Sequence, residues 1–147
     1  MVIRCLAYIH LFPKRRRRKK MKKIIVAIQN TLVREAVIGA LKKRGFFVEK
    51  SLSQLPDKVA MACDVFFAVV LLMDAGRAAE NSFERRMETV RCVRKNNPSL
   101  KTGLLCDNVS DPEIARKVKQ AKEMGLIDVF FYESVQTDYL CDVVDSL

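Results

Sequence analysis

The sequence predicts an α/β domain in which a doubly wound, five-stranded parallel sheet carries helices on both of its faces. Five short apolar runs alternate along the chain with five amphipathic segments, and 147 residues suffice to bury one core. The apolar runs lack the polar alternation of a sheet with one wet face, so helices are expected to cover both sides. Right-handed crossovers between parallel strands then favour a doubly wound sandwich.

The first strand and helix follow the start of this domain. Ile24–Ile28 is a continuous, β-branched apolar run, which is typical of a buried strand. A helix that Asn30 or Thr31 caps comes next, with one apolar face formed by Leu32, Val33, Ala36, Val37, Ala40 and Leu41. Gly45 ends this helix, and Phe46–Val48 is predicted as a short second strand.

The middle of the chain holds the longest apolar run. Pro56–Cys63 is predicted as a helix that the proline opens, and Phe66–Met73 is the strongest predicted strand. A loop containing Gly76 follows. The next helix is predicted over Phe83–Lys95 and stops at Asn96-Asn97-Pro98, and its apolar face is formed by Phe83, Met87, Val90 and Val93.

The last third repeats the alternation twice. Thr102–Cys106 is the fourth predicted strand, and Ser110–Glu113 has the capping-box spacing that opens a helix. Gly125 closes that helix, whose inward residues are predicted to be Ile114, Val118, Ala121 and Met124. Leu126–Tyr132 is the fifth predicted strand, and the last helix is lined by Tyr139, Leu140, Val143, Val144 and Leu147.

The formal charge of +10 is concentrated at the start of the chain. Residues 1–20 contain eight Lys or Arg and no acid, whereas the remainder contains 19 basic and 17 acidic residues. We therefore divide the chain into a basic N-terminal extension, residues 1–20, and one folded domain, residues 21–147. We interpret the extension as sequence upstream of a true start at Met21. An arm for anionic lipid or nucleic acid and a solvated tail without a role are the other interpretations.

The cysteine and histidine content excludes several kinds of site. The five cysteines form no C-x-x-C pair, and His10 is the single histidine. Zinc sites, Cys/His dyads and Ser/His/Asp triads therefore lack parts. Free thiols favour a cytoplasmic protein, and no apolar run reaches the roughly 18 residues that a membrane span needs.

Ligands of open parallel sheets bind beyond the carboxyl ends of the strands. The first such end, Gln29-Asn30-Thr31, offers neither a G-x-G-x-x-G loop nor a Walker lysine. This absence argues against nucleotide and dinucleotide enzymes, and it leaves no backbone cradle for a flavin phosphate.

Several local motifs resemble response-regulator receivers of the chemotaxis-regulator type. They are Leu32-Val33-Arg34-Glu35-Ala36, Gly45-Phe46-Phe47-Val48, Asn97-Pro98 and Asp111-Pro112-Glu113. The resemblance covers residues 22–147 and implies a flavodoxin-like, receiver-like fold.

Receivers of this family hold a magnesium ion with an acidic pair after the first strand. They also carry an acceptor aspartate after the third strand, a Thr or Ser after the fourth and a lysine after the fifth. The resemblance places the acidic pair on Ile28 and Gln29, the acceptor on Asp74, the hydroxyl on Cys106 and the lysine on Tyr132. Only the acceptor keeps the residue type of the family, so the domain resembles an atypical, degenerate receiver.

The altered residues predict weak chemistry at this site. A hard dication prefers several carboxylates, so Asp74 with the amide oxygens of Gln29 or Asn30 should bind Mg²⁺ only weakly. We expect no resident cofactor. Phosphoryl transfer needs electrostatic stabilisation that the missing groups supply. Asp74 is thus the one phosphoacceptor candidate, and a capping role in its loop is the favoured interpretation.

Other candidates have simpler interpretations. Cys106 is expected to be a small buried hydrophobe rather than a reactive thiolate. Asp107 and Glu133 are expected to be solvated or capping rather than ligands, and Phe131 and Tyr132 to pack rather than form a recognition surface. A solvated face, or a surface for an acidic partner, is the interpretation for the cluster Arg85, Arg86, Arg91, Arg94 and Lys95.

The sequence therefore predicts a stand-alone pseudo-receiver that acts in signal transduction through protein–protein interaction and is not an enzyme. The expected partner is a sensor kinase, an ATPase or another output protein. The resemblance assigns its docking to the fourth helix, fifth strand and fifth helix. We expect no small-molecule substrate, and nucleic acid or membrane contact only through residues 1–20. The alternatives are a two-component phosphorelay receiver phosphorylated on Asp74, and a flavodoxin-like enzyme with an unrecognised strand-end site.

Overall fold

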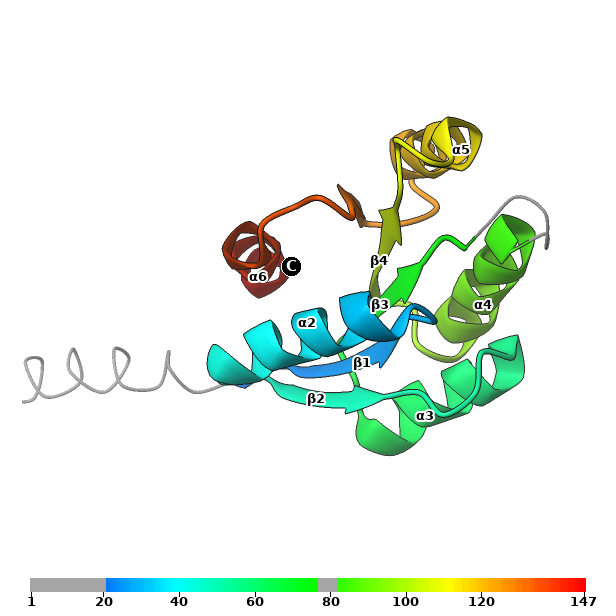
Figure 1. Ribbon diagram of the computed structural model, residues 1–147. Helices are drawn as coiled ribbons and strands as arrows, with labels where there is room; N and C mark the ends of the chain where they lie inside the picture. The colour runs from blue at the N-terminus through cyan, green and yellow to red at the C-terminus, as the bar shows by residue number, and fades with distance from the viewer. Residues whose placement is uncertain (1–20, 77–81) are drawn as a thin grey trace, which may run out of the picture.

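The computed structural model describes residues 21–76 and 82–147, and our interpretations of residues 1–20 lie outside these ranges. Strands and helices alternate along the described chain (Figure 1). The strands are β1 (Lys23–Ala27), β2 (Phe47–Lys50), β3 (Val70–Asp74), β4 (Lys101–Cys106) and β5 (Val129–Tyr132). The helices are α2 (Thr31–Lys43), α3 (Pro56–Phe66), α4 (Ser82–Asn96), α5 (Pro112–Glu123) and α6 (Thr137–Ser146).

The five strands form one parallel sheet in the order β2-β1-β3-β4-β5. The order reverses direction between β1 and β3, which is the switch point of a doubly wound sheet. The register pairs Ala27 with Met73, so β1 and β3 end side by side at the carboxyl edge. The predicted fold class is therefore confirmed.

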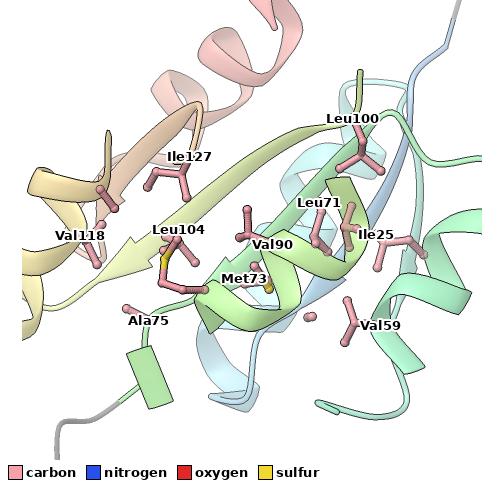
Figure 2. Packing of buried hydrophobic residues seen from close by; sticks show 14 of the residues in the cluster. Ile25, Val59, Leu71, Met73, Ala75, Val90, Leu100, Leu104, Val118 and Ile127 are labelled. Carbon is pink, nitrogen blue, oxygen red and sulfur yellow. The ribbon is translucent and has the colours of Figure 1, made fainter. Parts of the chain in front are cut away.

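Alternate residues of each strand enter two separate cores, which explains why the strands are apolar throughout. In β1, Ile25 and Ala27 pack on one face of the sheet, whereas Ile24 and Val26 pack on the other. The first core lies beneath α3, α4 and α5, and Figure 2 shows its side chains converging from the sheet and these helices. The second core lies beneath α2 and α6, which contact each other on the opposite face (Figure 1).

Two strands begin three or more residues later than predicted. The third strand begins at Val70 rather than Phe66, because α3 continues to Phe66 and Phe67 then turns the chain. The fifth strand begins at Val129 rather than Leu126. Both errors lie where an apolar segment joins a helix end to a strand, and hydrophobicity alone does not separate the two.

Four residues predicted to face the core are exposed, and one of them, Ala36, lies in the middle of α2. Leu32, Met124 and Tyr139 lie at or near the ends of helices, where the apolar face extends past the sheet that it covers. The predicted N-terminal caps of the helices agree more closely with the structure. Of the two residues predicted to cap α2, Asn30 does so, and its side chain accepts from the backbone N–H of Val33; Asp111 rather than Ser110 caps α5. No helix in residues 21–76 and 82–147 is long and apolar enough to cross a bilayer.

Phe67 occupies a backbone conformation that normally belongs to glycine. It forms the C-cap of α3 with φ 59° and ψ 45°, and its side chain is 76% exposed. A bulky residue in the left-handed region costs about 1–3 kcal/mol. The Lys23 ammonium lies 5.6 Å from the Phe67 ring centroid and offsets part of that cost.

Replacing Phe67 by asparagine should therefore stabilise the fold. Asparagine tolerates the left-handed region, so Phe67→Asn is expected to raise the free energy of unfolding by about 1 kcal/mol in urea denaturation. Phe47→Asn is the control, because Phe47 is a half-exposed aromatic in an ordinary strand and should lose stability. A lower unfolding free energy in Phe67→Asn would contradict this assignment of strain.

Candidate functional site

Asp74 lies at the carboxyl end of β3, where the parallel sheet places its ligand edge. Its side chain is buried, and both carboxylate oxygens accept hydrogen bonds. Oδ2 accepts from the backbone N–H of Gln29 at 3.1 Å, and Oδ1 accepts from Nη2 of Arg86 at 2.6 Å. The acceptor candidate is therefore held by the end of β1 on one side and by a guanidinium on the other.

Arg86 reaches this position from α4 and is only 3% exposed. Besides the Asp74 carboxylate, its Nε donates to the backbone carbonyl of Asp74 at 2.8 Å, and its Nη2 donates to the carbonyl of Ala27 at 3.0 Å. One guanidinium thus joins the ends of β1 and β3 to helix α4. Charge-assisted bonds of this geometry are among the strongest that a protein forms.

The solvated-face interpretation is thus wrong for Arg86. In the same cluster, Arg85, Arg91 and Lys95 are exposed and Arg94 is half-buried. A sequence signal for the difference exists, because Arg86 stands three residues after Phe83 and four before Val90, on the apolar face of the helix.

Gly76 allows α4 to begin close to the strand end. Its φ is +77°, and a Cβ placed on it would lie 2.1 Å from the Cβ of Ser82, the first residue of α4. Only glycine fits such an approach without moving the chain. The short distance brings the first turns of α4 against the end of β3, and from there the Arg86 side chain reaches Asp74.

The two residues that the resemblance assigns to the acidic pair contribute core packing and a backbone hydrogen bond instead of carboxylates. Ile28 is fully buried and packs in the core beneath α2 and α6. Gln29 is exposed, and its backbone N–H rather than its amide group meets Asp74. Asn30 caps α2 with its side-chain oxygen. The three residues therefore bring a backbone donor to Asp74, and Ile28 brings no oxygen side chain.

Cys106 ends β4 as a buried, neutral thiol. Burial, followed by the nearby Glu133 and Asp107 carboxylates, raises the pKa of the Cys106 thiol to about 11. Its Sγ lies 3.7 Å from the carbonyl oxygen of Phe131. Burial also raises the pKa of Cys63 to about 12. Neither thiol is prepared to become a nucleophile, which agrees with the expected packing role.

The remaining strand-end groups form caps and ring contacts. Asp107 Oδ1 accepts from the backbone N–H groups of Val109 and Ser110, both at 3.0 Å, so it caps the loop after β4. The Tyr132 ring packs edge-on against Phe130, with ring centroids 5.6 Å apart. Phe131 is buried beneath α2 and α6. Tyr132 thus supplies an aromatic edge at the position to which the resemblance assigns a lysine.

The residues around Asp74 do not fit a magnesium site. Across residues 21–76 and 82–147, no group of three or more His, Cys, Asp or Glu side chains could hold a metal ion. The oxygens that a dication would need are already hydrogen-bonded: the Asp74 carboxylate and carbonyl and the Ala27 carbonyl. A buried guanidinium in contact with these oxygens would also repel a second cation.

Comparison with known proteins identifies the architecture. No protein-family model and no curated protein matches the sequence. A response regulator from Desulfuromonas acetoxidans is similar in structure, with a TM-score of 0.64 and 15% identity over 85% of this chain and 94% of that one. A receiver domain protein from Methanospirillum hungatei gives a TM-score of 0.66 and 14% identity over 86% and 93% of the two chains.

A third solved structure leads to the same assignment. A response regulator receiver protein from Pseudomonas putida gives a TM-score of 0.63 and 18% identity over 87% of this chain and 98% of that one. Identities this low speak for the fold and not for the chemistry of the site. The strand order, the two helical layers and these three similarities together show that the chain has the fold of a response-regulator receiver domain.

Proposed function

We propose that this chain is a pseudo-receiver that signals by binding other proteins, and that Arg86 takes the role that a metal ion has in phosphorylated receivers. The observation that carries the proposal is that both carboxylate oxygens of Asp74 already accept hydrogen bonds from the protein. Its two carboxylate oxygens are bonded to Arg86 and to the Gln29 N–H, at 2.6 and 3.1 Å. A built-in cation neutralises the acceptor without metal and without phosphate.

The chemistry of phosphoryl transfer supports this proposal. The acceptor oxygen must be free to approach phosphorus, and cationic groups must stabilise the charge on the transferred phosphoryl oxygens. Here the guanidinium holds one acceptor oxygen. Cys106 supplies no hydroxyl at the end of β4, and Tyr132 supplies no ammonium group at the end of β5. Arg86 also donates hydrogen bonds to the backbone carbonyls of Asp74 and Ala27, so its N–H groups already connect the ends of β3 and β1.

The output surface follows from the resemblance. The fourth helix, fifth strand and fifth helix that receivers use for docking correspond here to α5, β5 and α6. This region exposes Leu126, Tyr132 and Tyr139, and aromatic side chains of this kind are enriched at protein interfaces. A sensor kinase, an ATPase or another output protein of the cytoplasm remains the proposed class of partner, and we propose no catalytic activity.

Acetyl phosphate with magnesium should leave this protein unmodified. The expected result is unchanged intact mass, with a phosphorylatable receiver as the positive control, because the Asp74 oxygens are already occupied. Arg86→Gln tests whether the guanidinium is the obstacle. Rapid stoichiometric labelling of the wild type that Asp74→Asn abolishes would reject the pseudo-receiver and support a phosphorelay switch.

Rebuilding the acidic pair should create a response to magnesium. In the double variant Gln29→Asp/Arg86→Gln, the guanidinium is removed and a second carboxylate is brought near Asp74. Added Mg²⁺ should then stabilise the fold by about 1 kcal/mol, which calorimetry would register as a shift of several degrees.

The matched control for the rebuilt site is Gln29→Asn/Arg86→Gln, which removes the guanidinium and adds no charge. It should respond to Mg²⁺ no more than the wild type does. If the carboxylate variant is equally indifferent to Mg²⁺, position 29 does not face Asp74 and the assignment of the acidic pair is wrong.

Removing one partner of the buried ion pair should cost far more than removing both. Arg86→Met leaves an uncompensated buried carboxylate and is expected to lower the unfolding free energy by about 3 kcal/mol. The double variant Arg86→Met/Asp74→Asn should recover most of that loss. Urea denaturation of the two single variants and the double variant gives the coupling energy.

Arg94 provides the control on the same helix. It is half-buried and pairs with Asp128 at 3.3 Å, so Arg94→Met should cost about 1 kcal/mol or less. Equal losses in Arg86→Met and Arg94→Met would mean that the Asp74 contact contributes no more than a surface pair.

A further inference from the structure

A large hollow lies at the opposite end of the sheet from Asp74, at the amino-terminal ends of the strands. Its volume is about 1140 Å³, and its walls include Met21, Phe47, Phe67 and Val69 together with Lys23 and Lys101. We name these six residues the basal surface. We propose that the basal surface docks on an anionic lipid bilayer, a role that is separate from the pseudo-receiver function of the other end.

The apolar part of the basal surface is unusually exposed. Phe67 is 76% exposed, Phe47 51%, Val69 45% and Met21 44%. These side chains come from the starts of three different strands and from the end of α3, so the fold gathers at one end what the sequence disperses. Clustered apolar exposure of this kind marks an interaction site rather than ordinary surface.

The charge of the basal surface favours an anionic partner. Lys22, Lys23 and Lys101 line the hollow, and no Asp or Glu is found among its described lining residues. Lys22 is engaged by the end of α6, since its Nζ lies 2.6 Å from the Asp145 carbonyl and 3.3 Å from that of Leu147. Lys23 and Lys101 remain to face a ligand.

Phe67 provides an independent indication of function. It is an exposed aromatic in the left-handed conformation at a helix end, where glycine would remove the strain and the exposure together. Strained residues persist where the surrounding structure enforces them, and they concentrate at functional sites. The Lys23 ammonium lies 5.6 Å from the ring centroids of both Phe66 and Phe67, so cation and aromatic ring are presented together.

A bilayer fits this combination better than a single protein partner does. Stable attachment to a membrane surface takes two signals, and an apolar insertion beside a polybasic segment is one such pair. Phenylalanine and methionine can enter the headgroup and acyl boundary, while the long lysine side chains keep their ammonium groups at the phosphates. The basal surface itself combines the two kinds of group, since its four exposed apolar side chains line the same hollow as Lys23 and Lys101.

Vesicle co-sedimentation of the full chain tests the proposal. The wild type should sediment with phosphatidylcholine vesicles that contain phosphatidylserine and not with phosphatidylcholine alone, and added salt should weaken the binding. Phe67→Asn should lower the affinity about tenfold. Because that substitution relieves backbone strain, unfolding does not explain a loss. Lys101→Glu should lower the affinity at least about fivefold.

The matched controls lie at the other end of the sheet. Val109→Asn removes an equally exposed apolar side chain after β4, and Lys58→Glu makes the same charge change in the first turn of α3. Both should leave vesicle binding near the wild-type level. Unchanged binding in Phe67→Asn would assign any affinity to residues 1–20 alone and overturn the proposal. Absence of binding to anionic vesicles would also overturn it, and would leave an acidic protein as the occupant to test.

Discussion

The buried contact between Arg86 and Asp74 is the interaction on which the arrangement of the carboxyl edge depends. Within the described chain it is the ion pair whose two side chains are both nearly inaccessible to water, and the same guanidinium also bonds the carbonyl groups of Ala27 and Asp74. Helix α4 is thereby fixed to the two central strands at the switch point of the sheet. The polar groups at this edge of the sheet, the Asp74 carboxylate and the Ala27 and Asp74 carbonyls, are thus hydrogen-bonded by a side chain of the protein itself.

The fold could be predicted from the sequence because its physical causes are local. Each strand has apolar residues on both faces, and Ile24–Ile28 shows why: neighbouring residues enter different cores. The cap of α2 at Asn30 could be predicted for the same reason, since its side-chain oxygen accepts from the backbone N–H of Val33, only three residues away. The end of α3 could not be predicted from the sequence, because nothing in the apolar segment from Val65 to Met73 indicates that Phe67 adopts the left-handed backbone conformation.

The candidate site was predicted only in part, for a different reason. The resemblance identified Asp74, and the structure places it buried at the strand end. The partner, Arg86, was missed because its meaning depends on a contact across the domain, between the second turn of α4 and the ends of β1 and β3. Composition describes Arg86 as one member of a basic cluster. Its phase on the helix, which matches that of the buried Val90 and Val93, is the information that separates it from Arg85 and Arg91.

The interdependence of Arg86 and Asp74 also constrains how this sequence can change over generations. Loss of either charge alone leaves the other buried without a counter-charge. Simultaneous replacement of both removes that penalty and leaves only the Ala27 and Asp74 carbonyls without their Arg86 donor. The two codons are therefore separated from any uncharged alternative by a fitness valley that a single mutation does not cross. Descendants of this gene should retain both residues or neither, so the pair should be inherited as one character.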